Sequence, residues 1–280
     1  MRVARKQTGF YRFIAAVLQT VMRVVTVPTW RGAEHLPAGG FLAVGNHVSN
    51  FDPLTFAHFL HGNGVPPRFL AKSSLFEVPV LGRMLRRLDQ IPVYRGTAQA
   101  AEALVAAEAA LAAGEGVAVF PEGTLTRDPA MWPMSGKTGV ARLALRTRVP
   151  VIPVAQWGAH LVLPPYTSSF RPLPRKPVTV VAGPPVNLDD LYDRPLEQEV
   201  LQEATRRIMA AVTAQLADIR GATPPAEPYD MRRDGDPHAA DDAARAARKA
   251  ARVAHKARGA ARNAARRQRP AAPTPSEEAR

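Results

Sequence analysis

The sequence contains no cysteine among its 280 residues. This absence excludes a disulfide framework, a thiol nucleophile and a zinc–thiolate site. It also agrees with a cytoplasmic protein.

A long uninterrupted apolar run is missing too. Residues 10–27 form the most apolar segment, but Arg12, Gln19 and Arg23 interrupt it. The remaining apolar stretches are too short to cross about 30 Å of hydrocarbon, so we do not expect a membrane span. No small-residue cleavage pattern follows the segment, which argues against a signal peptide.

Polar residues within this N-terminal segment recur at helical spacing. Arg5, Arg12, Gln19 and Arg23 fall seven, seven and four positions apart, so they share one stripe of a helix whose other faces are apolar. A narrow cationic stripe on an apolar helix predicts a membrane-interface helix within residues 1–29. The alternative is a helix that packs on its own domain.

Charge and composition change at the other end of the chain. The formal charge is +13, from 37 basic and 24 acidic residues, and favours anionic partners such as phosphorylated substrates, acidic carrier proteins, anionic membranes or nucleic acid. Residues 221–237 are typical of a linker, and residues 239–269 consist mainly of Ala, Arg and Lys. We interpret residues 221–280 as a disordered or helical basic tail that touches anionic lipid; the alternative is a nucleic-acid-binding arm.

Residues 30–220 alternate between strand-like and helical patterns, which predicts an α/β domain. Several strands are continuous apolar runs, as expected for a mostly parallel or mixed sheet flanked by helices on both faces. The expected strands are 41–45, 68–71, 90–94, 117–120, 151–155 and 178–182. The expected helices are 53–61, 80–87, 97–113, 138–148 and 196–220, and the proline-rich stretch 163–177 is expected to be a surface loop.

The most informative stretch joins the first of these strands to the first helix. His47 and Asp52 lie five positions apart in Asn-His-Val-Ser-Asn-Phe-Asp-Pro. Histidine exchanges a proton near neutral pH, and a nearby carboxylate can set its tautomer, so the pair is a candidate for acid–base chemistry. The alternative is structural: Asp52 as a helix N-cap followed by Pro53.

A second stretch follows an apolar strand that ends at Phe120-Pro121. It carries Glu122, Gly123, Thr124 and, after Leu125 and Thr126, Arg127. Glycine lets a ligand approach the backbone, and arginine can hold a phosphate through two hydrogen bonds.

Together these stretches resemble a known family. His47 and Asp52 form an H-x4-D motif, residues 120–124 match F-P-E-G-T, and residues 91–96 and 149–154 are similar to two further blocks. Residues 71–76 and Gly82 also resemble a family segment. The order and spacing, over about residues 30–215, resemble the PlsC-like glycerolipid acyltransferases, the 1-acylglycerol-3-phosphate acyltransferase family. The chain has Leu125 where members often carry Arg.

The resemblance implies a reaction and roles for these residues. A fatty acyl group would move from acyl-CoA or acyl-carrier protein to the free hydroxyl of 1-acylglycerol-3-phosphate, giving phosphatidic acid, at the cytoplasmic face of the cell membrane. His47 would act as general base and Asp52 would orient it, with no metal and no cofactor besides the acyl donor. The other implied site residues would bind substrate: Arg95, Glu122, Gly123, Thr124, Arg127 and Lys72, with Lys137 an equally plausible neighbour.

The resemblance predicts a geometry for the site and leaves alternatives for the acceptor and the class of protein. The His47 ring and the Asp52 carboxylate should lie within hydrogen-bond reach and face a pocket shared with Glu122 and Arg95. The acceptor could instead be another lysophospholipid or an amino-acid-derived lyso-lipid, and a protein of a different class would bind nucleic acid or lipid through its basic tail.

Overall fold

The computed structural model describes residues 8–94, 100–240, 243–244, 247 and 251. It divides into two units, residues 1–230 and residues 231–280. The predicted site residue Arg95, the basic residues before Thr8 and most of the basic tail lie outside the described residues. The second unit contributes one described short helix, α8 (Met231–Asp234).

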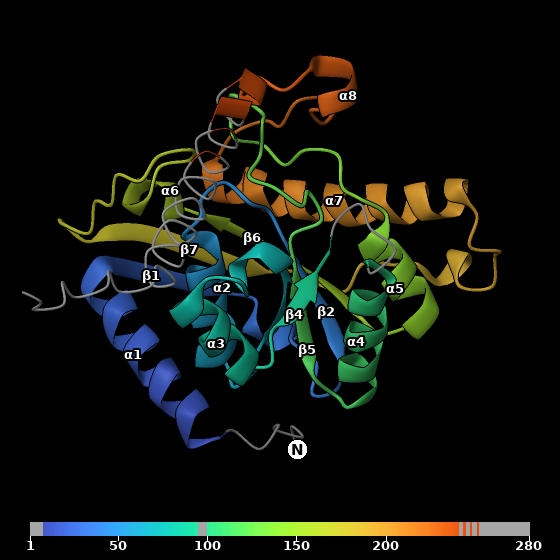
Figure 1. Cartoon of the computed structure of the whole chain (residues 1–280). Coiled ribbons are helices and arrows are strands. Elements are labelled where there is room, and N and C mark those ends of the chain that lie inside the picture. Colours follow the sequence, from blue (N-terminus) through green and yellow to red (C-terminus); the bar gives the residue numbers. More distant parts are fainter. Residues whose placement is uncertain (1–7, 95–99, 241–242, 245–246, 248–250, 252–280) are drawn as a thin grey trace, which may run out of the picture. The chain divides into compact units, whose positions relative to one another are not determined.

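The first unit is built on one mixed seven-stranded sheet, as the alternating pattern predicts (Figure 1). Its order is β1-β7-β6-β2-β5-β3-β4. The five strands from β6 to β4 run parallel, whereas β7 is antiparallel to β6 and carries β1 parallel to itself at the edge. The strands are β1 (Thr26–Arg31), β2 (Phe41–Gly45), β3 (Arg68–Lys72), β4 (Ile91–Val93), β5 (Gly116–Val119), β6 (Val151–Trp157) and β7 (Lys176–Ala182).

Helices cover both faces of the sheet, which explains the continuous apolar runs. In β2, Leu42 and Val44 join a core with helices α4, α5 and α7, whereas Phe41 and Ala43 face the opposite core with α2. All five residues of β2 are buried. The helices of this unit are α1 (Gly9–Val25), α2 (Asp52–Gly62), α3 (Pro79–Arg87), α4 (Ala100–Ala112), α5 (Gly139–Thr147), α6 (Ala159–Val162) and α7 (Gln198–Arg220).

Strand β1 is not expected from the sequence pattern, which predicts a helix within residues 1–29. The helix ends at Val25 and β1 begins at Thr26. The Thr26 hydroxyl donates to the Met22 carbonyl and closes the last turn. Among the described strands, β1 pairs with β7 alone, about 150 positions later in the chain, so no local signal separates it from the helix.

Helix α1 has one packed face and one apolar exposed face. Tyr11, Ala15 and Met22 are buried against the domain. Phe13 and Val24 keep 63% and 57% of their surface exposed. The helix therefore packs on its own domain and still presents an apolar stripe outward. None of the described helices has the length and hydropathy needed to cross a membrane.

Candidate active site

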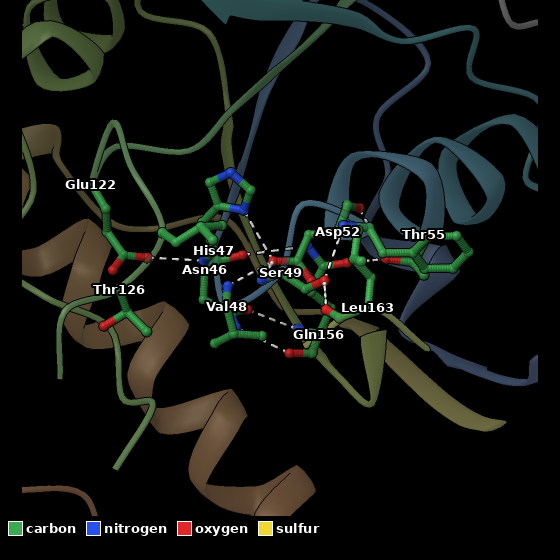
Figure 2. Close-up of polar contacts among 12 residues, drawn as sticks. Asn46, His47, Val48, Ser49, Asp52, Thr55, Glu122, Thr126, Gln156 and Leu163 are labelled. Atoms are coloured by element: carbon green, nitrogen blue, oxygen red, sulfur yellow. Dashed lines mark hydrogen bonds and ion pairs between the residues drawn. The ribbon is translucent and has the colours of Figure 1, made fainter. Parts of the chain in front are cut away.

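The carboxyl end of β2 holds the His47–Asp52 pair (Figure 2). Nδ1 of His47 lies 3.0 Å from Oδ2 of Asp52, which confirms the predicted hydrogen-bond reach. The same oxygen accepts from the backbone N–H groups of Val48, at 2.6 Å, and Ser49, at 2.7 Å. With Nδ1 donating to the carboxylate, Nε2 is the nitrogen that can accept a proton.

Asp52 does not cap its helix as the structural alternative proposed. Helix α2 begins at Asp52, and the preceding Phe51 occupies the N-cap position without a side-chain bond. The Asp52 carboxylate instead turns back onto the loop, where two N–H groups and the imidazole converge on one oxygen. Because Asp52 is buried, this loop geometry holds the carboxylate rigidly toward His47.

A buried polar network lies beneath the loop and was not predicted. Asn46 donates to the Gln156 carbonyl and accepts from the Gln156 N–H at 2.8 Å, which joins β2 to β6. Thr55 in α2 donates to the Gln156 side chain. The Ser49 hydroxyl donates to the Leu163 carbonyl at 2.6 Å, consistent with its reading as a loop residue. Asn46 adjoins the motif, but nothing in the sequence links Gln156 to it.

Glu122 holds the second motif against the first. Oε1 accepts from the His47 N–H at 2.9 Å and Oε2 accepts from the Met134 N–H at 3.0 Å. The Thr126 N–H donates to the His47 carbonyl at 2.7 Å. With 1% of its surface exposed, Glu122 is desolvated, and burial raises its pKa to about 8 despite the two backbone hydrogen bonds.

An apolar cavity of about 520 Å³ opens beside His47. Phe120 forms part of its wall and stacks on the His47 ring, with centroids 4.2 Å apart. Four elements supply most of the apolar wall: α1 with Ile14 and Leu18, α2 with Leu54 and Ala57, β3 with Phe69 and Leu70, and α3 with Leu81, Met84 and Leu85. Leu88, which follows α3, adds to it.

The predicted substrate-binding residues divide into two groups. Gly123, Thr124 and Lys72 border the cavity with His47. Among the described residues, Glu122 and Arg127 do not line it, so the expected pocket shared with Glu122 is wrong. Burial explains both cases: Glu122 lies beneath the loop, and Arg127, 7% exposed, has its guanidinium 4.8 Å from the centre of the Tyr166 ring.

Lys137 lies beside Gly123. Gly123 has a φ of +72°, and a Cβ there would stand 3.3 Å from Lys137 Nζ. A glycine in the left-handed region lets the backbone turn tightly under this ammonium group. The Lys137 ammonium group thus lies beside Gly123, a residue that borders the cavity.

Comparisons with known proteins agree with this geometry. The family described as Acyltransferase matches residues 27–157. The chain is 27% identical over 184 residues to a chloroplastic 1-acyl-sn-glycerol-3-phosphate acyltransferase of Brassica napus, covering 65% of this chain and 52% of the relative. It is 30% identical over 162 residues to a 1-acyl-sn-glycerol-3-phosphate acyltransferase of Limnanthes douglasii, covering 57% and 54%. The chain thus spans about half the length of these curated relatives.

A solved structure shares the fold. The crystal structure of the 1-acyl-sn-glycerophosphate acyltransferase PlsC from Thermotoga maritima superposes with a TM-score of 0.58 at 22% identity, over 76% of this chain and 83% of that one. The likeness to this structure shows a shared mixed α/β fold, and residues 27–157 match the Acyltransferase family. Over part of its length the chain is similar to 1-acyl-sn-glycerol-3-phosphate acyltransferases.

Proposed function

We propose that this protein transfers a fatty acyl group from acyl-CoA or acyl-carrier protein to the free hydroxyl of 1-acylglycerol-3-phosphate. The product is phosphatidic acid, a precursor of phospholipids. The observation that carries the proposal is the His47–Asp52 pair, joined at 3.0 Å, at the edge of a large apolar cavity. A proton acceptor next to a space for a hydrocarbon chain suits acyl transfer between a thioester and an alcohol.

His47 acts as the general base in this mechanism. Its Nε2 takes the proton of the acceptor hydroxyl while that oxygen bonds to the thioester carbonyl carbon. Asp52 holds the tautomer through Nδ1 and stabilises the imidazolium that forms. When the carbon–sulfur bond breaks, the imidazolium returns the proton to the leaving thiolate. The nucleophile belongs to the substrate, so no serine of the protein forms an acyl intermediate.

The cavity is the proposed binding site for an acyl chain. Its wall is mainly apolar, and each methylene that leaves water contributes about 0.8 kcal/mol. Gly123, Thr124, Lys72 and Lys137 lie where the polar end of the acceptor would be held. Substrate-binding roles are also proposed for Arg95 and Arg127. Glu122 would contribute indirectly, by ordering the loop that carries His47.

The location proposed for the protein is the cytoplasmic face of the cell membrane. The support is α1, whose exposed apolar residues lie beside Arg12 and Arg23. Such a helix lies in the interface, with its cations near anionic headgroups. Because the same helix lines the cavity, a lipid chain can pass from the bilayer to the site with little exposure to water.

A mass-spectrometric assay with paired donors and acceptors tests the function. Purified full chain is supplied with acyl-CoA or acyl-carrier protein, and with lysophosphatidate or another lyso-lipid. We expect phosphatidic acid from wild type and none from His47→Ala. Leu125, an apolar residue, borders the cavity, and transfer only to a different lyso-lipid would reassign the acceptor. Transfer by His47→Ala at the wild-type rate would overturn the mechanism.

A further inference from the structure

The loop between α6 and β7 projects large apolar side chains into solvent. Phe170 keeps 53% and Leu173 keeps 70% of its surface exposed. Arg171 and Arg175, both exposed, alternate with them. Exposed apolar residues that stand between cations match the chemistry of a headgroup–acyl boundary better than that of water.

This loop is tied to the end of α1. Nε and Nη2 of Arg175 both donate to the Thr26 carbonyl, at 3.1 Å and 2.8 Å. Thr26 lies at the junction between α1 and β1. Val24 and Val27, on either side of that carbonyl, are exposed apolar residues. The loop therefore continues the exposed apolar stripe of α1 around the edge of the sheet, where β1 and β7 lie (Figure 1).

Neither element carries a carboxylate. The sequence has no Asp or Glu in residues 1–33 and none in residues 129–188. The second range also contains a further cation, Lys176, next to Arg175 of the loop. Two elements that carry exposed apolar side chains and cations, and no carboxylate of their own, are complementary to an anionic bilayer. Acidic residues near the loop would have repelled such a surface.

The loop also contacts the segment that carries the catalytic histidine. The rings of Phe51 and Phe170 have centroids 6.3 Å apart. At the start of the loop, the Leu163 carbonyl accepts from the Ser49 hydroxyl at 2.6 Å. Ser49 and Phe51 belong to the turn between His47 and Asp52. A lipid that contacts Phe170 is therefore separated from this turn only by the Phe170 and Phe51 rings.

We propose that residues 163–175 form a second membrane-contacting element, which inserts Phe170 and Leu173 into an anionic bilayer beside α1. This inference deepens the proposed function, since it assumes that the protein works on membrane lipid. With two contacts, α1 and the loop, the domain has a defined tilt on the bilayer. The tilt presents the cavity, which α1 lines, to the lipid side.

A tryptophan reporter tests insertion directly. The full chain carrying Phe170→Trp is mixed with vesicles of phosphatidylcholine and phosphatidylglycerol that contain brominated acyl chains. The matched control is Val105→Trp, because Val105 is 63% exposed on α4, which packs over the opposite end of the sheet. We expect a blue shift and at least twofold stronger quenching for Phe170→Trp, and wild-type quenching for the control.

Co-sedimentation with the same vesicles supplies the second readout. We expect Phe170→Ser/Leu173→Ser to lower lipid partitioning at least fivefold, and Val105→Ser to leave it unchanged, with circular dichroism confirming that both fold. Equal quenching of the two reporters, or wild-type partitioning of the double variant, would overturn the proposal. So would a loss confined to the KM for acyl-carrier protein, which would assign the surface to a protein partner.

Failure of the proposed function gives a different pattern. In that case no acyl transfer is detected with any donor, while the vesicle measurements still separate Phe170 from Val105. A detergent assay with short-chain lysophosphatidate completes the comparison. We expect the double variant to keep wild-type turnover there, because the substrate no longer has to be drawn from a bilayer.

Discussion

The backbone N–H of His47 donates to Oε1 of Glu122 at 2.9 Å, across 75 positions of sequence. A buried carboxyl group thus holds the main chain of the proposed base, while Asp52 holds its ring. The two motifs act on different parts of one residue. Loss of Glu122 should therefore displace His47 without changing its side chain.

Glu122 should make stability depend on pH. Its pKa is raised from 4.5 to about 8 by burial, so the folded protein keeps the proton over a range where the unfolded chain releases it. The stability contributed by Glu122 is complete below about pH 4.5 and falls by about 1.4 kcal/mol per pH unit up to about pH 8. Denaturant unfolding of wild type and Glu122→Gln across this range should show their difference in unfolding free energy changing with pH. A constant difference would contradict the assignment.

Asp52→Asn should separate two roles of Asp52: orienting the loop and the His47 ring, and supplying a negative charge beside the imidazolium. The amide oxygen can replace Oδ2 as acceptor for Val48 and Ser49, and the amide nitrogen then takes the place of Oδ1, a buried atom with no hydrogen-bond partner among the described residues. The fold should survive, but the imidazolium loses its anionic partner. We expect acyl transfer to fall about 10²- to 10⁴-fold. Near-wild-type turnover in Asp52→Asn would remove Asp52 from the mechanism.

Gly123→Ala should destabilise the protein and lower activity. The left-handed backbone at φ +72° strains any residue with a Cβ by about 1–2 kcal/mol, and that Cβ also meets Lys137 at 3.2 Å. Gly114→Ala is the matched control, because its φ is +79° and nothing lies within 4 Å of the added atom. Both variants should lose similar stability in denaturant unfolding. Only Gly123→Ala should raise the KM for the acceptor, and equal KM values would separate Gly123 from substrate binding.

Ala57→Phe should shorten the acyl chains that the protein accepts. Ala57 borders the cavity from α2, five residues or about 7.5 Å along the helix from Asp52. A phenyl ring there fills space that a long chain would occupy. Assays over a series of acyl-CoA lengths should show a selective loss for long donors, whereas the exposed control Ala112→Phe keeps the wild-type profile. A uniform loss across all lengths would place the acyl chain elsewhere.

Local sequence patterns determined much of this protein. Continuous apolar runs marked the buried strands β2, β5 and β6, and helical spacing located α2, α3 and α7 within a few residues. The His47–Asp52 contact also follows from local chain geometry, because five positions at a strand-to-helix turn bring the two side chains together. These features depend on neighbours in the chain, so the sequence contains their physical cause.

Tertiary structure alone decided the rest. Strand β1 exists because β7 lies beside it, and Gln156 reaches Asn46 only because β6 pairs with β2. The same packing buried Glu122 beneath the loop and turned Arg127 toward Tyr166, away from the cavity where a cation was expected. Burial and direction depend on residues far away in the chain. Residue types and their spacing therefore identified the pair that we propose as reacting groups, and only the fold showed which charged groups surround it.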